Sequence, residues 1–208
     1  MLKKRALNAQ IRLTLVIGKN DAANLEEVVL ESFKGGVTAL QLREKSLDDK
    51  DFYEEALKLS LLCREHKKLF IINNRVDIAL AVDADGVHLG EGDLPVEAAL
   101  KILPKNKILG FSASSKESAR DAILKGVDYL GVGALYASPS KPEAPVVTPE
   151  TIQSIISLKW PTVGIGGITT NNAHLAWAYG FNGLALISAL TRAEDPAKVA
   201  EKILSGCI

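Results

Sequence analysis

Polar and charged residues that could bind an anion follow an apolar run near the start of the chain, in the segment from Gln41 to Lys45. Side chains alternate along a strand, so Gln41, Arg43 and Lys45 are predicted to share one face and the two residues between them the other. Two cations on one face repel each other unless an anion lies between them. The segment therefore predicts an anion-binding site. The alternative is ordinary surface charge on a strand that ends in solvent.

A second anion site is predicted from the pair Gly166-Gly167 together with Ser188, because each follows an apolar run that has the composition of a strand. Glycines between a strand and a helix let backbone N–H groups approach an oxyanion. The alternative is that the two glycines serve only a tight turn.

Further residues complete a set that could bind a phosphate group together with a metal cation. Lys141 adds a charged donor, and Asn73 and Ser112 add neutral ones. Asp93 supplies an acid that could hold Mg²⁺ against phosphate oxygens, although it could also cap a following helix.

Two other residues are predicted to have structural roles. Ser114 precedes Glu117 by three positions, which is the spacing of a capping box at a helix start. His88 lies within a β-rich run and is predicted to be a hydrogen-bonded core histidine instead of a metal ligand.

These residues lie between short β-rich runs that alternate with longer helical ones. Glycine precedes every second predicted strand, which is a weak internal repeat. Eight strand–helix units in about 200 residues predict a (β/α)₈ TIM barrel, with residues 1–208 as a single domain. An open doubly wound sheet is the alternative, but it would concentrate its polar site at one switch point, whereas polar residues here follow nearly all the strands. The predicted strands are 12–17, 37–43, 69–72, 86–89, 108–112, 129–134, 162–165 and 183–187, and the helices are 23–34, 49–66, 76–82, 95–103, 115–125, 149–157, 171–178 and 195–204.

The composition excludes several classes of protein. Equal numbers of basic and acidic residues, 25 of each, argue against bulk binding to nucleic acid or acidic membranes. The two cysteines form no disulfide framework, so the chain is predicted to be cytoplasmic. No apolar run approaches the length of a membrane span, and the run from Ile11 to Ile17 is predicted to be a first strand instead of a signal peptide. Small-molecule substrates are the expected partners, and a homo-oligomer is left open.

The motifs, taken together, resemble the thiamine-phosphate synthase family. The resemblance runs in the same order from about residue 31 to residue 196. It implies a (β/α)₈ barrel that joins 4-amino-2-methyl-5-hydroxymethylpyrimidine diphosphate to 4-methyl-5-(2-phosphoethyl)thiazole with Mg²⁺ as cofactor. The motifs are Gln41-Leu42-Arg43-Glu44-Lys45, Ile72-Asn73, Gly86-Val87-His88-Leu89-Gly90 with Asp93, Asp128-Tyr129-Leu130-Gly131-Val132-Gly133, Gly164-Ile165-Gly166-Gly167-Ile168-Thr169 and Ile187-Ser188-Ala189.

Carried over position by position, the resemblance implies two substrate subsites and one metal site. Catalysis would rest on Arg43, Lys45, Lys141 and Ser112, which would stabilise the leaving pyrophosphate, and Mg²⁺ would bind Asp93 and Asn74. The pyrimidine diphosphate would contact Gln41, Leu42, Arg43, Glu44, Lys45, Asn73, Ser112 and Lys141, and the thiazole phosphate would contact Ser138, Pro139, Ser140, Gly167, Ile187 and Ser188.

The chain departs from the family pattern at two informative positions. Asn74 stands where the family generally has Asp, so Mg²⁺ is expected to bind less tightly, with Glu91 compensating in part. Ser114 stands where the related thiazole tautomerases commonly carry His, which disfavours a tautomerase. A tautomerase-like paralogue and a non-catalytic barrel that binds a phosphate ligand remain the alternatives.

Overall fold

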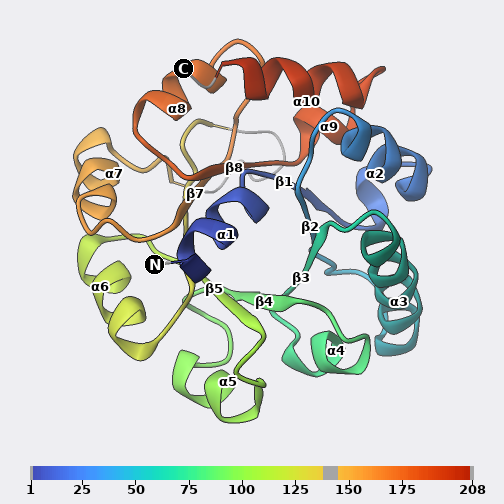
Figure 1. Ribbon diagram of the computed structural model, residues 1–208, viewed down its shortest axis with the longest axis horizontal. Helices are drawn as coiled ribbons and strands as arrows, with labels where there is room; N and C mark the ends of the chain where they lie inside the picture. The colour runs from blue at the N-terminus through green and yellow to red at the C-terminus, as the bar shows by residue number, and fades with distance from the viewer. Residues whose placement is uncertain (1, 138–144, 207–208) are drawn as a thin grey trace.

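Eight parallel strands close into a barrel in the computed structural model of the chain, which describes residues 2–137 and 145–206, the side chains of residues 2–5 excepted (Figure 1). Each strand pairs with the next one along the chain, and β8 pairs with β1. The predicted (β/α)₈ barrel is confirmed. The strands are β1 Leu13–Ile17, β2 Ala39–Leu42, β3 Leu69–Asn73, β4 Gly86–Leu89, β5 Ile108–Ser112, β6 Tyr129–Val132, β7 Thr162–Ile165 and β8 Gly183–Leu186.

Helices surround the barrel, as Figure 1 shows. The predicted helices and strands end within two residues of those observed, because glycines and helix caps mark most of their ends. The elements α1, η1 and α9 were not predicted. The helices are α1 Leu2–Gln10, η1 Lys19–Asp21, α2 Leu25–Lys34, α3 Asp49–Glu65, α4 Val76–Ala81, α5 Val96–Ile102, α6 Lys116–Lys125, α7 Pro149–Ile156, α8 Ala173–Ala178, α9 Ser188–Thr191 and α10 Pro196–Ser205.

Alternating side chains divide the core into two layers. On β2, Leu40 and Leu42 are fully buried in the larger apolar cluster, which joins strands to helices. Ala39, one position out of phase, belongs to a smaller cluster inside the barrel. Gln41 has the phase of Ala39 and is 8% exposed, so its side chain lies in the barrel interior. The predicted opposition between Gln41 and its leucine neighbours is confirmed.

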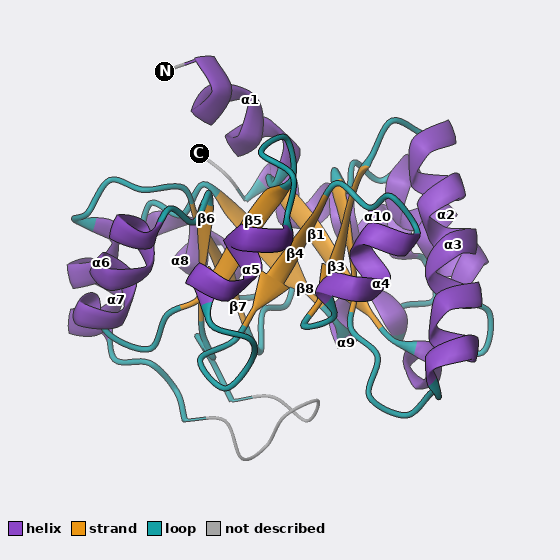
Figure 2. Cartoon of the chain, turned by 90° about the horizontal axis from the view of Figure 1, so that it is seen from below, coloured by secondary structure: helices purple, strands orange, loops and turns teal. Residues whose placement is uncertain are grey.

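Helix α1 covers the amino-terminal end of the barrel (Figure 2). Leu7 and Ile11 pack into the interior cluster beside Val16. The chain then passes so close to β8 that a Cβ on Gly183 would lie 1.9 Å from the carbonyl oxygen of Ile11. The predicted first strand is confirmed as β1, and helix α1 before it was not predicted. Leu7 and Ile11 are buried under the barrel and stabilise α1 there.

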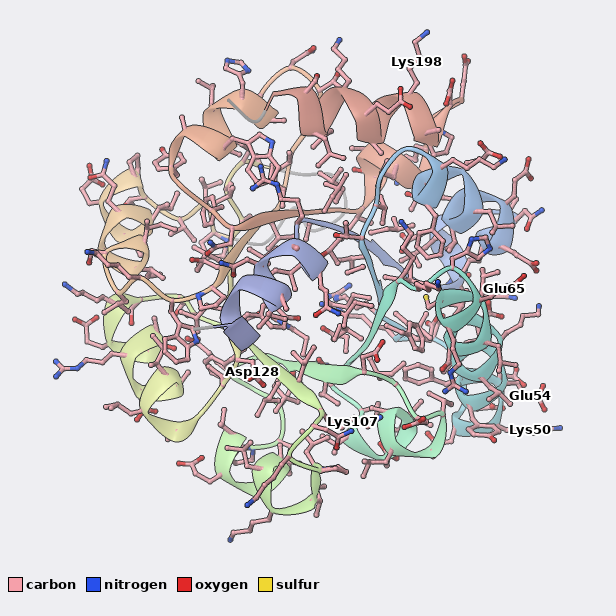
Figure 3. The ribbon with its side chains drawn as sticks, viewed as in Figure 1. Lys50, Glu54, Glu65, Lys107, Asp128 and Lys198 are labelled. Carbon is pink, nitrogen blue, oxygen red and sulfur yellow. The ribbon has the colours of Figure 1, made fainter. Side chains whose placement is uncertain are left out.

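Polar side chains before every second strand repeat one hydrogen-bonding pattern. Thr38, Asp85, Asp128 (labelled in Figure 3) and Asn182 directly precede β2, β4, β6 and β8. Each side-chain oxygen accepts from a backbone N–H near the start of the preceding strand, and each backbone N–H donates to the carbonyl of that same residue. The partners are Leu13, Phe70, Leu109 and Thr162, with side-chain distances of 3.0, 2.8, 2.9 and 2.9 Å. The weak glycine repeat in the sequence therefore accompanies this pattern of paired hydrogen bonds, which occurs before β2, β4, β6 and β8.

Charges of both signs lie on the outer face of the helical ring. Lys50, Glu54 and Glu65 project from α3 and Lys198 from α10 (Figure 3), and the Lys50 Nζ lies 3.9 Å from a Glu54 carboxylate oxygen. None of the helices described is both long enough and apolar enough to span a bilayer.

Candidate functional site

The carboxyl ends of all eight strands meet at the end of the barrel opposite α1 (Figure 2). Parallel strands in a closed barrel bring these ends to one rim, which is where the active sites of such barrels lie. The rim receives Arg43 after β2, Asp93 after β4 and Ser188 after β8. It also receives Asn73 and Asn74 from β3, Ser112 from β5, Gly167 after β7 and Ile187 after β8. The predicted residues Ser138, Pro139, Ser140 and Lys141 lie outside the described residues.

The loop after β2 begins sooner than predicted. The strand ends at Leu42, so Arg43 and Lys45 belong to a loop, and the predicted alternation of faces does not extend to them. The Arg43 N–H donates to the carbonyl of Ile17 at 2.9 Å, and a Cβ on Gly18 would lie 2.6 Å from the Arg43 carbonyl oxygen. Arg43 is half-buried and Lys45 is exposed. The backbone contacts of Arg43 anchor this cationic loop to the end of β1.

Glu44 holds the same loop in place. Its carboxylate accepts from the backbone N–H groups of Lys19, Lys45 and Ser46 at 2.8, 2.6 and 2.8 Å. Partial burial acts to raise the pKa of Glu44, but these hydrogen bonds outweigh it, and the pKa lies below its usual value. Glu44 is therefore ionised at neutral pH, and its carboxylate ties the loop after β2 to the loop after β1.

Asn73 and Asn74 form a pair of amides at the end of β3. The Asn73 side-chain N–H donates to the Asn74 Oδ1, and the Asn74 backbone N–H donates to the His88 carbonyl at 2.9 Å. Asn74 has a φ of 67°, a left-handed conformation that Asn and Asp tolerate better than most residues. The pair sets one amide oxygen at the rim beside the loop after β4.

Asp93 closes a turn instead of capping a helix. Its Oδ2 accepts from the Gly90 N–H at 2.6 Å, and its own N–H donates to the Gly90 carbonyl at 3.1 Å. The residue at the cap of α5 is Pro95, so the alternative role of Asp93 as that cap is wrong. The turn holds a half-buried carboxylate in the loop after β4.

Glu91 is bound to the start of α6. Its Oε1 accepts from the hydroxyls of Ser114 and Ser118, each at 2.7 Å. These hydrogen bonds lower the pKa of Glu91. The predicted capping box at Ser114 is wrong, because the cap of α6 is Ser115, which accepts from the Ser118 N–H. Glu91 thus joins the loop after β4 to the next helix, a contact that no local spacing marked.

Ser112 lies at the rim end of a hydrogen-bonded chain that reaches into the barrel. Its Oγ lies 2.9 Å from the His88 Nε2, and the His88 Nδ1 lies 2.9 Å from the Tyr129 hydroxyl. Tyr129 also forms a hydrogen bond with the Gln41 side chain. Burial lowers the pKa of His88 to about 4, so the imidazole is neutral at pH 7, and burial raises the pKa of Tyr129. The prediction of a hydrogen-bonded core histidine is confirmed.

The register of the strands explains why His88 and Tyr129 meet. Gly110 of β5 pairs with His88 on one side and Tyr129 on the other. A Cβ on Gly110 would lie 2.2 Å from the Tyr129 Cζ and 2.6 Å from the His88 Nδ1. Only a glycine leaves room for the two rings to touch across β5. Tyr129 was missed as a site residue because its partner lies 41 positions away, and no sequence pattern marked the pair.

The glycine turn after β7 packs against the loop after β6. Gly166 and Gly167 have φ angles of 102° and 65°. A Cβ on Gly167 would lie 2.6 Å from the carbonyl oxygens of Tyr136 and Ala137. The turn therefore requires glycine for both its backbone conformation and this close approach, so the tight-turn role is shown. The short helix α9 begins nearby in the chain's last βα loop, at Ser188, in the position where barrels of this class often bind phosphate.

Together, the fold and the site define a (β/α)₈-barrel enzyme whose polar groups gather at the carboxyl ends of the strands. The model of a family described as "Thiamine monophosphate synthase" matches residues 13–190. The chain belongs to this family, and it is an enzyme, a transferase of thiamine biosynthesis.

Individual relatives agree with this assignment. The chain is 40% identical over 199 residues to the thiamine-phosphate synthase of Methanobrevibacter smithii, covering 95% of each chain. It is 44% identical over 181 residues to that of Ruminiclostridium cellulolyticum, covering 86% of each. A solved structure of thiamine phosphate pyrophosphorylase from Pyrococcus furiosus superposes with a TM-score of 0.88 at 40% identity, covering 97% of each chain.

Proposed function

We propose that the chain joins 4-amino-2-methyl-5-hydroxymethylpyrimidine diphosphate to 4-methyl-5-(2-phosphoethyl)thiazole, or to its carboxylate form, giving thiamine phosphate and pyrophosphate. One observation carries the proposal: two unlike groups of residues with the chemistry to bind anions share one rim of the barrel. The cationic loop with Arg43 and Lys45 suits a diphosphate, and the glycine turn at Gly167 with Ser188 suits a monophosphate.

The proposed reaction needs no nucleophile from the protein. The C–O bond between the pyrimidine methylene and the diphosphate breaks first, and both electrons leave with pyrophosphate. The lone pair of the thiazole nitrogen then forms the new C–N bond to the pyrimidinylmethyl cation. Arg43, Lys45 and Lys141 would neutralise the charge that builds on pyrophosphate, and Ser112 would donate a hydrogen bond to it. Holding the second substrate by its phosphate would place its nitrogen in line.

Asn74 and Asp93 have the chemistry of a magnesium site. They follow the adjacent strands β3 and β4 and offer an amide oxygen and a carboxylate, which are hard ligands of the kind that Mg²⁺ prefers. Mg²⁺ usually takes one or two carboxylates and completes its shell with water and substrate phosphate oxygens. When bound, the ion would neutralise charge on the diphosphate. Because Asn74 is uncharged, binding should be weaker than at a site with two carboxylates.

The direct test supplies both substrates, with and without Mg²⁺, and measures thiamine phosphate and pyrophosphate. We expect product that depends on Mg²⁺. Arg43→Ala and Lys141→Ala should each lower turnover by about 100-fold or more. Lys50→Ala is the matched control, because Lys50 is an exposed lysine on α3. Rates like the wild type in either site variant would remove that residue from the proposed role.

Two other outcomes would replace the proposal. Interconversion of thiazole phosphate isomers without Mg²⁺, and without formation of thiamine phosphate, would show a tautomerase. Binding of the phosphate ligands with no reaction of either kind would show a non-catalytic barrel.

A further inference from the structure

Gln41, Tyr129, His88 and Ser112 form one chain of hydrogen bonds, called here the relay, from the barrel interior to the rim. His88 and Gln41 are 7% and 8% exposed. The His88 ring is tightly held, since a Cβ on Gly131 would lie 3.0 Å from its Cε1. The relay therefore joins a buried, closely packed histidine to a half-buried residue at the rim.

The number of protons limits the relay to two directions. A neutral imidazole carries one N–H, and each hydroxyl carries one O–H. In the outward direction Tyr129 donates to the His88 Nδ1, and the His88 Nε2–H donates to the Ser112 Oγ. In the inward direction Ser112 donates to the Nε2, and the Nδ1–H donates to Tyr129. Imidazolium, which would allow a third arrangement, would place a charge on a buried ring whose two nitrogens already face the neutral hydroxyls of Tyr129 and Ser112.

The two directions give Ser112 opposite properties at the rim. In the outward direction its O–H remains to donate to a ligand, and in the inward direction only lone pairs face the ligand. A phosphate oxygen accepts hydrogen bonds, so it is attracted in the first case and repelled in the second. The cationic loop with Arg43 and Lys45 lies on the same rim and favours an anionic ligand there.

We propose that His88 is a positioning residue whose Nε2–H holds the Ser112 hydroxyl oxygen, so that the Ser112 O–H donates to a diphosphate oxygen of the bound substrate. The proposal rests on the proposed function for the identity of that ligand. It assigns a role in the reaction to Tyr129 and His88, neither of which needs to touch the substrate. Gln41 supports the same direction when its amide N–H donates to the Tyr129 oxygen.

The first test reads the direction of the relay without any turnover. The ¹⁵N spectrum of the histidine side chains is recorded for the protein with pyrophosphate and Mg²⁺, and the His88 signals are assigned from their loss in His88→Gln. The chain has three histidines, so the assignment is tractable. We expect the tautomer protonated on Nε2. His88 protonated on Nδ1 in this sample would overturn the proposal. A chemical shift of the His88 Nε2 that stays the same in Ser112→Ala would also overturn it, because that variant removes the acceptor of the Nε2–H.

The second test separates positioning from folding. His88→Gln keeps a side-chain N–H that can reach Ser112, whereas His88→Leu fills the space without a donor. Losing a hydrogen bond made in the transition state lowers kcat and kcat/KM together. We expect His88→Leu to lower kcat by about tenfold to 100-fold, close to the loss in Ser112→Ala, and His88→Gln to restore most of it. Equal kcat values in the two His88 variants would contradict the proposal.

Tyr129→Phe keeps the relay testable if His88→Leu fails to fold. It removes the donor to the His88 Nδ1 while keeping the ring, so both tautomers of His88 become populated, and kcat should fall severalfold. An unchanged His88 tautomer with unchanged kcat would show that Tyr129 has no such role. Failure of the proposed function is recognised separately, because wild-type protein would then form no thiamine phosphate, while the spectrum would still report the tautomer.

Discussion

Replacing Asn74 with Asp adds one negative charge at the proposed magnesium site with little change in structure. Asp tolerates the left-handed φ of 67° about as well as Asn, and its carboxylate can still accept from the Asn73 side chain. The substitution therefore tests charge at a constant backbone. It should tighten Mg²⁺ binding.

The size of the effect follows from the exposure of this position. A carboxylate and a doubly charged Mg²⁺ ion 4 Å apart attract by about 8 kcal/mol at the effective dielectric constant typical near a protein surface, and by about 2 kcal/mol in bulk water, twice the values for two unit charges. Asn74 is exposed, so screening brings the expected gain to about 1 to 2 kcal/mol. Since 1.4 kcal/mol is a factor of ten, Asn74→Asp should lower the Mg²⁺ concentration for half-saturation about tenfold.

The assay is a titration of Mg²⁺ in the presence of pyrophosphate, followed by calorimetry and, in parallel, by the rate of thiamine phosphate formation. Asp93→Asn is the reciprocal variant. Its side-chain oxygen can still accept from Gly90, so the turn is kept. Because the variant removes one negative charge, it should raise the Mg²⁺ requirement. The double variant Asn74→Asp/Asp93→Asn restores the number of charges and should lie between the two. The reasoning is refuted if Asn74→Asp binds Mg²⁺ no more tightly than the wild type.

Two further predictions concern stability. Glu91→Gln should lower the free energy of unfolding at pH 7 by about 1 kcal/mol, because the Glu91 carboxylate is bound to Ser114 and Ser118. Those contacts also replace the expectation from the sequence that Glu91 helps to bind Mg²⁺, so the Mg²⁺ requirement should be unchanged in this variant. The folded-state pKa of Glu91 is depressed, so this stabilisation is present above pH 4.5 and is lost as the pH falls through the folded-state pKa. Urea unfolding of the wild type and the variant at several pH values checks this dependence. A difference in unfolding free energy between the two proteins that persists at the lowest pH contradicts it. Gly183→Ala should cost about 3 kcal/mol or more, because its Cβ would overlap the Ile11 carbonyl, while Gly92→Ala, with no atom within 4 Å, should stay within about 0.5 kcal/mol of wild type. Equal midpoints of thermal unfolding for the two alanine variants would contradict the close contact between Gly183 and Ile11 at the amino-terminal end of the barrel.

Local sequence was enough to predict the strands, most helices and their order. Apolar runs of four to six residues bounded by glycine or polar residues have the period of buried strands, and helix caps such as Thr148 before Pro149 mark helix starts. Because parallel strands align their carboxyl ends, the order alone placed Arg43, Asp93 and Ser188 on one rim. Helix α1 was missed because its stability depends on Leu7 and Ile11 packing under the barrel.

Short-range patterns misled where a distant residue competed for the same group. Ser114 has the spacing of a capping box, but its hydroxyl donates to Glu91, 23 positions earlier. Asp93 has the position of a helix cap, but its carboxylate accepts from Gly90 in a turn of its own. A hydrogen-bonding side chain takes whichever partner the fold brings nearest, and spacing along the chain records only some of those partners.

The sequence by itself determined the barrel, the family motifs and the chemical types of the residues at the rim. Only the tertiary structure decided how those residues act together: that Glu91 binds α6, that Glu44 holds the loop after β2, and that His88 and Tyr129 meet across Gly110. The physical reason is that strand periodicity is a property of neighbours in the chain. The hydrogen bonds of His88 depend instead on the register of three strands, which is set only when the barrel closes.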